Sequence, residues 1–231
     1  MSKITIAIDG FSSTGKSTLA KQLAKALKYI YVDTGAMYRA ITLYAMRNGY
    51  IGKGDEQIDG LLSDLDKIIL KFVYNSDKGF AEMYLNGENI EQEIRTLEVS
   101  KHVSRIAELK EVRSKLVVLQ QEMGKKKGIV MDGRDIGTVV FPDAELKIFM
   151  TASPEKRAYR RYKELLDRGD KVTYEEILEN VEKRDYIDSH REFSPLKRAK
   201  DAIEFDNSDM GLKEQFERIL GYALRIIEKQ K

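Results

Sequence analysis

A glycine-rich stretch close to the N-terminus constrains the fold of this chain more than any other feature. It matches the pattern G-x-x-x-x-G-K-[ST] as Gly10-Phe11-Ser12-Ser13-Thr14-Gly15-Lys16-Ser17-Thr18. The glycines of such a loop let successive backbone N–H groups turn inward around a phosphate, and the lysine adds a positive charge at the β- and γ-phosphates. We therefore predict that these nine residues bind the phosphates of a nucleoside triphosphate and that Lys16 neutralises the group being transferred.

The flanking segments are those that such a loop requires. Isoleucine occupies every second position from Ile4 to Ile8, which is typical of a strand buried on both faces. Leucine recurs every fourth position from Leu19 to Leu27, which predicts a helix that begins where the loop ends. The N-terminus of that helix adds its unsatisfied N–H groups to the anion site. A plain Gly/Ser-rich turn would not explain a lysine and a serine directly after the second glycine.

The composition excludes several other classes of protein. The 231 residues include 40 basic and 38 acidic side chains, so the net charge of +2 gives no global attraction to nucleic acid or to a membrane. The chain has no cysteine and only two histidines, which excludes disulfides and a zinc cluster. A strand already begins by residue 3, which leaves no room for a signal peptide. We therefore expect a cytoplasmic protein that binds neither nucleic acid nor membranes.

The remaining apolar patterns alternate between strands and helices. Strands are predicted at 29–32, 128–131, 145–150 and 202–206, and the second of these reads as buried. Helices are predicted at 36–49, at 96–123 with a break near 109–111, and at 153–168, 173–189 and 212–228. Residues 68–90 instead read as an antiparallel meander with turns at 75–79 and 86–87. The sequence thus predicts an α/β fold of the P-loop NTPase type: a five-stranded parallel sheet wrapped by helices, an inserted antiparallel β-rich substrate-binding subdomain and a helical lid.

These elements group into three parts. Residues 1–35, 124–152 and 190–231 are predicted to form the P-loop core. Residues 36–123 hold a helix for a monophosphate substrate, the β-meander insert and the connecting helices. Residues 153–189 form two arginine-rich lid helices.

One carboxylate is placed to serve a metal ion. Asp132 follows the apolar run 129–131, at the end of a strand, where P-loop enzymes hold the acid that faces the Mg²⁺ shell. The hydroxyl of Ser17 is the expected direct ligand. An aspartate at a strand end is also a common cap or turn residue, and the phosphate loop is what favours the Mg²⁺ site here.

Arginines then distinguish among the proteins that share this loop. Arg157, Arg160 and Arg161 are three and four residues apart, so they emerge on one face of a helix that Gly169 ends. They are either a solvated basic face or a flap that closes over phosphates, where guanidinium groups stabilise the charge of the transition state.

The next helix repeats the feature and favours the second interpretation. Arg184, Asp188 and Arg191 are spaced i, i+4 and i+7, again on one face. A GTPase would instead need a guanine-reading [NT]-K-x-D motif, and the corresponding place has no lysine: Phe205-Asp206-Asn207-Ser208-Asp209.

Longer segments resemble a known family. They are Asp33-Thr34-Gly35-Ala36-Met37-Tyr38-Arg39, Glu93-Ile94-Arg95, Lys183-Arg184-Asp185 and the run from Asp132 to Pro142, DGRDIGTVVFP. Together they resemble the signature segments of bacterial cytidylate kinases, which phosphorylate CMP and dCMP with ATP. The resemblance covers about the whole chain, and these motifs are more specific than the phosphate loop, which many families share.

The resemblance implies a role for each matching residue. Lys16, Arg157, Arg160 and Arg161 would act on ATP and the transferring group, with Mg²⁺ at Ser17 and Asp132. The residues implied to bind CMP are Thr34, Arg39, Arg134 and Arg191 at the phosphate, Arg184 and Asp188 at the ribose, and Ser104, Arg113 and Asp135 at the cytosine. One departure is Phe11, where the family commonly has a proline. Because proline presets the turn, we expect Phe11 either to loosen the loop or to pack elsewhere.

The chemistry of cytosine agrees with this implied assignment. Cytosine presents an amine donor beside two acceptors, so Asp135 can accept from the amine while Arg113 donates to the ring. Uracil would turn an acceptor toward the carboxylate. Two alternatives stay open: another small-molecule P-loop kinase, of UMP or another nucleoside monophosphate, or a nucleotide-dependent regulator or RNA-binding module. We expect a monomer with small-molecule substrates, because a lid and an insert must move.

Overall fold

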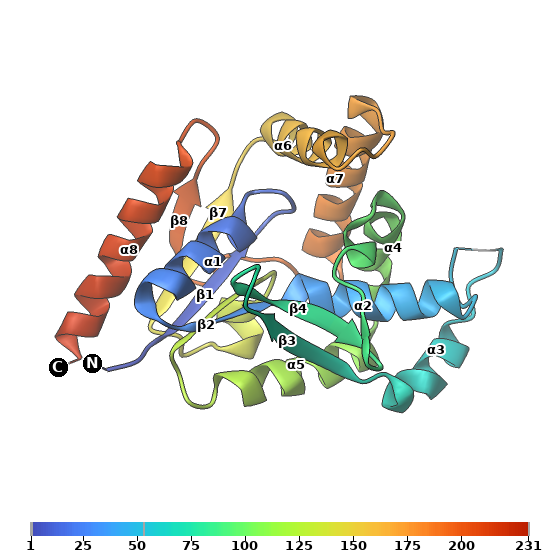
Figure 1. Ribbon diagram of the computed structural model, residues 1–231, viewed down its shortest axis with the longest axis horizontal. Helices are drawn as coiled ribbons and strands as arrows, with labels where there is room; N and C mark the ends of the chain where they lie inside the picture. Colours follow the sequence, from blue (N-terminus) through green and yellow to red (C-terminus); the bar gives the residue numbers. More distant parts are fainter. Residues whose placement is uncertain (1, 53, 231) are drawn as a thin grey trace. The chain divides into compact units, whose positions relative to one another are not determined.

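The computed structural model describes residues 2–52 and 54–230 and confirms the predicted α/β fold (Figure 1). The contacts divide the chain into two compact units. The first unit comprises residues 1–32 and 121–231, and the second comprises residues 33–120. Each is described by itself below.

A five-stranded sheet organises the first unit, with the order β2-β6-β1-β7-β8. The strands are β1 (Thr5–Gly10), β2 (Ile30–Asp33), β6 (Ile129–Gly133), β7 (Leu146–Thr151) and β8 (Ile203–Asp206). β1 runs parallel to β6 on one side and to β7 on the other, and β7 runs parallel to β8. Every residue of β1 is buried, as the isoleucine pattern predicts for a central strand. The phosphate loop therefore leaves the middle of the sheet.

Two helices, α1 (Lys16–Leu27) and α8 (Leu212–Lys229), cover this sheet and close its core. Two others, α6 (Pro154–Asp167) and α7 (Tyr174–His190), pack against each other. The leucines of α1 and the apolar face of α8 pack against β1 and β7 in one continuous cluster. The two chain ends lie side by side, and the Ser2 hydroxyl donates to the Gln230 carbonyl at 3.1 Å (Figure 1). Among the described residues, no helix is long and apolar enough to span a membrane.

Local signals in the sequence set the ends of the helices in this unit. Ser153 caps α6 through the N–H of Lys156, and Pro154 follows at the first helical position. Thr173 and Glu176 form the predicted capping box of α7. In the described part of this unit, a π-type helical turn at Ile136–Val140, within the DGRDIGTVVFP run, was not predicted.

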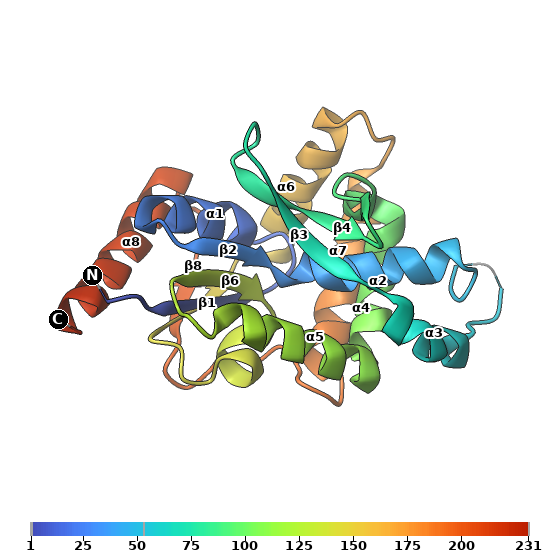
Figure 2. The same cartoon turned by 60° about the horizontal axis from the view of Figure 1, so that its bottom comes forward.

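The second unit combines the predicted meander with four helices. The strands β3 (Leu70–Asn75), β4 (Phe80–Leu85) and β5 (Glu88–Asn89) form an antiparallel sheet. The helices are α2 (Thr34–Arg47), α3 (Ile58–Asp64), α4 (Leu97–Glu108) and α5 (Lys110–Gly124), with 3₁₀ turns at Leu65–Lys67 and Glu93–Arg95. α4 and α5 are interrupted at Leu109, which confirms the predicted break. Both β4 and the second 3₁₀ turn pack on α2 (Figure 2).

Replacing a leucine in the core of the first unit tests this packing. Leu23 is fully buried on α1, so Leu23→Ala leaves a cavity and should lower the free energy of unfolding by about 2–5 kcal/mol. Leu224→Ala is the matched control, because Leu224 is 44% exposed on α8, and it should cost no more than about 1 kcal/mol. Urea unfolding of both variants measures the difference, and equal losses would contradict the packing.

Candidate active site

The phosphate loop closes tightly around its lysine. α1 begins at Lys16 itself, and Gly15 occupies the N-cap position. The Lys16 ammonium donates to the Phe11 carbonyl at 2.6 Å and to the Thr14 hydroxyl at 3.2 Å. Burial, together with the positive charge of Arg134, lowers the pKa of Lys16 well below its ordinary value. A buried cation in a loop of backbone N–H groups is suited to bind a phosphate anion.

Phe11 packs against the protein instead of loosening the loop. Its ring meets Phe149 edge to face, with centroids 6.0 Å apart. The guanidinium of Arg157 lies 5.2 Å from the centroid of the same ring. Of the two outcomes expected at this position, the structure shows packing, which gives the loop an apolar anchor where proline would have restricted the backbone.

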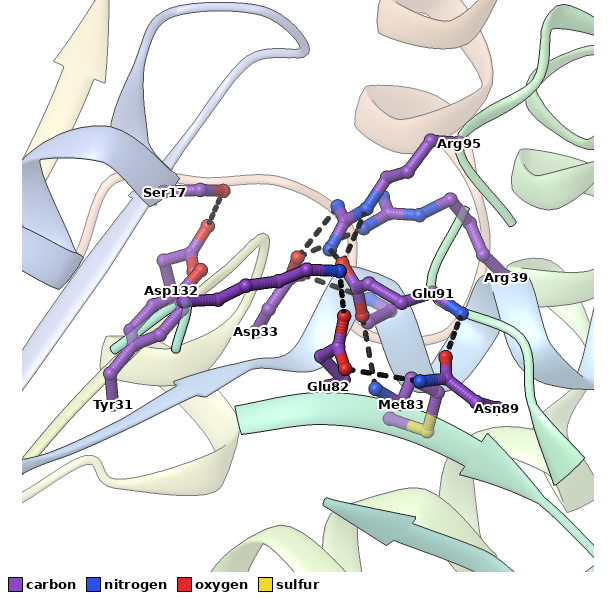
Figure 3. Close-up of polar contacts among 12 residues, drawn as sticks. Ser17, Tyr31, Asp33, Arg39, Glu82, Met83, Asn89, Glu91, Arg95 and Asp132 are labelled. Carbon is purple, nitrogen blue, oxygen red and sulfur yellow. Dashed lines mark hydrogen bonds and ion pairs between the residues drawn. The ribbon is translucent and has the colours of Figure 1, made fainter. Parts of the chain in front are cut away.

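Asp132 is held by two hydroxyl groups. Ser17 donates to one carboxylate oxygen at 3.0 Å, and Tyr31 donates to the other at 2.9 Å (Figure 3). The predicted pair of Ser17 and Asp132 is thus brought together, and both supply the oxygen ligands that a hard cation prefers. The sequence reading missed Tyr31, whose only signal is its place on the strand next to the one that carries Asp132.

Arg157 is a structural partner of the loop. It is almost fully buried and donates to the carbonyls of Ala152, at 2.8 Å, and Ser12, at 3.1 Å. Its remaining nitrogen pairs with Asp185 at 2.5 Å. This first residue of the predicted lid triplet therefore connects α6 and α7 to the phosphate loop.

The other two arginines of α6 differ from each other. Arg160 donates to the side-chain oxygen of Asn207 at 3.0 Å and to its carbonyl at 2.7 Å, whereas Arg161 pairs with Glu164 at 2.9 Å. Asn207 in turn donates to the Thr14 carbonyl at 2.7 Å. Sequence reasoning considered Asn207 only as part of an absent guanine motif and missed that it connects α6 with the loop.

A second cluster lies around Asp188 in the first unit. Arg134 donates to this carboxylate at 2.8 Å, and Arg191 lies 3.9 Å from its other oxygen. Burial would raise the pKa of Asp188, but the positive charges of Arg134, Arg184 and Arg191 outweigh it and lower that pKa. The structure thus brings together four residues that were predicted to bind the substrate: Arg134, Arg184, Asp188 and Arg191.

The second unit contains a similar cluster around Asp33. Arg39 and Arg95 share one oxygen of this carboxylate at 3.0 and 2.8 Å, and the other oxygen accepts the N–H of Ala36 at the start of α2 (Figure 3). Burial would raise the pKa of Asp33, but the two guanidinium groups hold it well below its ordinary range. Arg95 also pairs with Glu91 at 2.7 Å. Thr34 is buried at the first position of α2.

The predicted base-reading residues of the second unit lie on α4 and α5. The buried Ser104 hydroxyl has no hydrogen-bond partner among the described residues. Arg113 is also buried; it donates to the Ala107 carbonyl at 3.0 Å and lies 5.3 Å from the centre of the Tyr38 ring. Both residues fit a site that is completed by a polar ligand.

The third predicted base-reading residue, Asp135, is buried two residues after the end of β6. Close to it lies a carboxylate that was not among the predicted site residues, Asp9. Asp9 accepts the N–H groups of Ile136 and Gly137 at 2.8 and 2.7 Å. Burial raises the pKa of Asp9 to about 7, against the effect of these two N–H donors.

A group of three or more histidine, cysteine or acidic side chains placed to hold a metal is not found in the described part of the chain.

The loop around Lys16, at the end of the central strand of a parallel sheet, places the chain among the P-loop kinases. A gluconokinase from Sinorhizobium meliloti is similar in fold, with a TM-score of 0.50 and 12% identity over 99% of this chain and 95% of that one. Within this class the chain belongs to the cytidylate kinase family, whose model matches residues 6–225.

Similar sequences agree with the family. A cytidylate kinase from Flavobacterium johnsoniae is 67% identical over 220 residues, which cover 95% of this chain and 96% of that protein. One from Bacteroides fragilis is 57% identical over 228 residues, covering 99% and 100%. The resemblance inferred from the signature segments is confirmed.

The pKa of Asp9 predicts how stability depends on pH. In the unfolded chain its carboxyl has a pKa of 3.8, against about 7 in the folded protein. Between about pH 4 and 7 the folded state therefore holds the proton more tightly, and this group makes stability fall as the pH rises. In Asp9→Asn this titration is removed, so stability should fall less over that range. Urea unfolding at pH 5, 6 and 7 measures both slopes. All other titrating groups are common to the two proteins, and parallel profiles would contradict the shift.

Proposed function

We propose that this protein transfers the γ-phosphoryl group of ATP to CMP or dCMP, giving ADP and CDP or dCDP. Family membership supports the reaction, and the single observation that carries it is the buried Lys16 inside the phosphate loop. A cation held in that position before the substrate arrives stabilises transferring charge without reorganisation.

The reaction depends on how the two substrates are positioned and does not need proton transfer to a protein group. A phosphate oxygen of CMP attacks the γ-phosphorus of ATP, the bond to the β–γ bridging oxygen breaks, and ADP leaves. The attacking oxygen is already a nucleophile, so a protein base is not needed. Lys16 and the backbone N–H groups of Gly10–Thr18 hold the ATP phosphates. Arg160 and Arg161 act from the ATP side of the lid, residues 153–189, and Arg157 contributes to catalysis by holding the phosphate loop through the Ser12 carbonyl.

Ser17 and Asp132 are the residues that would hold Mg²⁺. Their hydroxyl and carboxylate oxygens are 3.0 Å apart, and Mg²⁺ commonly binds one or two such protein groups, with waters and substrate phosphates completing its shell. The ion would neutralise charge that builds up on the phosphate oxygens. The Tyr31 hydroxyl keeps Asp132 oriented through its other oxygen.

We assign the CMP contacts from the sequence pattern of the family, and the paired arginines of both units support the assignment. Each unit holds arginines against a buried carboxylate, at Asp188 in one and at Asp33 in the other. Such pairing keeps guanidinium groups ordered for a phosphate or a ribose. The assigned contacts are Thr34, Arg39, Arg134 and Arg191 for the phosphate, Arg184 and Asp188 for the ribose, and Ser104, Arg113 and Asp135 for the base.

We also propose that the chain works in three functional parts: a P-loop core (1–35, 124–152 and 190–231), a monophosphate-binding part (36–123) and a lid (153–189). The proposal includes a monomeric state, because the lid and the insert must move, and a cytoplasmic location, where ATP and nucleoside monophosphates are found.

A substrate panel tests the function. ADP formation is measured with CMP, dCMP, UMP, AMP and GMP, and we expect activity with CMP and dCMP far above the rest. Preference for UMP or a purine nucleotide would favour another nucleoside monophosphate kinase. ATP binding without ADP formation would favour a regulatory or RNA-binding role.

Lys16→Ala should lower kcat in that assay by roughly 10²–10⁴, because one preorganised charge at the phosphates is lost. Lys25→Ala, which removes an exposed lysine from the same helix, is the control and should keep its activity. Circular dichroism checks that both variants fold. Activity of Lys16→Ala within twofold of wild type would contradict the role of the loop.

Asp135→Asn should reduce discrimination between CMP and UMP. The amide keeps the size of the carboxylate but can also present a donor, which suits the uracil oxygen. The CMP complex should lose roughly 1–3 kcal/mol of transition-state stabilisation, about tenfold to a hundredfold in kcat/KM. Asp143→Asn, at an exposed position shortly downstream, is the control. An unchanged CMP/UMP ratio would move base recognition away from Asp135.

A further inference from the structure

The helical turn that follows Asp135 is capped from another strand. A helical turn begins with backbone N–H groups that have no partner within it. In the turn Ile136–Val140 the first two of these groups both donate to Asp9, Ile136 to Oδ1 at 2.8 Å and Gly137 to Oδ2 at 2.7 Å. The carboxylate of β1 therefore serves as the cap of a turn that starts more than 120 residues further along the chain.

Asp135 occupies the position from which a cap normally comes. It is the N-cap residue of the turn, and aspartate is among the residues most favoured there because its side chain accepts from the first turn. Yet the Asp135 side chain makes no capping hydrogen bond. Asp9 supplies both acceptors in its place, so the Asp135 carboxylate is not drawn back onto its own turn.

The fit between Asp9 and the turn is close. A Cβ atom added at Gly137 would lie 3.3 Å from the Asp9 carboxylate and 3.2 Å from the side chain of Lys147, both tighter than ordinary van der Waals contact. Glycine at this position lets the backbone approach Asp9. Asp9 itself is buried next to Gly10, the first glycine of the phosphate loop.

We propose that Asp9 is a positioning residue for base discrimination: by capping the turn at Ile136 and Gly137, it fixes the backbone that follows Asp135 and so orients the Asp135 carboxylate toward the base. The inference rests on the proposed function, since it assumes that Asp135 reads cytosine. It also means that the strand which begins the ATP loop orients the base-reading segment, because Asp9 and Gly10 are consecutive in β1.

Asp9→Asn tests the proposal at constant size. An amide has one acceptor oxygen and turns a donor toward the second N–H, so one of the two capping bonds is lost. At pH 8, above the pKa of about 7 at which Asp9 gains its charge, we expect the CMP/UMP ratio of kcat/KM to fall by about tenfold, the effect of one lost hydrogen bond to a charged group. KM for CMP should rise several-fold, while KM for ATP changes by less than about twofold. A merely structural loss would lower activity with CMP and UMP alike and leave their ratio unchanged.

Glu145→Gln is the matched control. Glu145 also accepts a backbone N–H of β1, that of Thr5 at 2.8 Å, but at the opposite end of the strand. The control makes the same change from carboxylate to amide, and it should leave the CMP/UMP ratio within about twofold of wild type.

A second variant covers the case in which Asp9→Asn does not fold. Gly137→Ala keeps Asp9 but forces the turn away from it, and it should shift the CMP/UMP ratio in the same direction. Amide hydrogen exchange without substrate gives an independent readout, in which the backbone amides of residues 136 and 137 should exchange faster in either variant than in wild type.

The outcomes separate the two proposals. A wild-type protein that forms no ADP with CMP would overturn the proposed function. An active wild type with unchanged CMP/UMP ratios in the folded variants would overturn the role of Asp9 alone.

Discussion

The close approach of two backbones at Gly10 is the constraint on which the phosphate loop depends. Gly10 has a φ of +144°, and a Cβ atom there would lie 2.1 Å from the carbonyl oxygen of Met150 on β7. No other residue avoids that clash, so glycine is what allows β1 to lie against β7 and still turn into the loop. The positions of Lys16 and Ser17 at the start of α1 follow from this turn.

The charged groups of both units are arranged by a second constraint, the cost of burying charge. Buried arginines and carboxylates are tolerated only when they are paired and hydrogen-bonded. Asp188 meets this condition with Arg134, and Asp33 meets it with Arg39 and Arg95. Removal of one partner from such a cluster typically costs about 3–5 kcal/mol, because a charge is left buried without compensation. The same pairing that permits burial also orders the guanidinium groups for phosphate.

Much of the fold could be predicted because it is encoded by short-range signals. The two-residue period of β1, the break at Leu109 and the capping box at Thr173 each lie within a few residues and have a single structural solution. The turn at Ile136–Val140 had no such signal. Its cap comes from Asp9, and a sequence window around the turn does not contain the acceptor that stabilises it.

The candidate site divides in the same way. By itself the sequence determined the phosphate loop, the acid at the end of β6, the three arginines of α6 and the charged face of α7, because spacing along one strand or helix places those side chains together. Only the tertiary structure decided that Asn207 connects Arg160 to the loop, that Tyr31 holds Asp132, and that Asp9 caps the turn after Asp135. Each of these contacts joins segments far apart in the chain. Buried polar groups need hydrogen-bond partners, and the fold supplies those partners from segments that are distant in the chain. The order of residues alone does not reveal which residue that partner is.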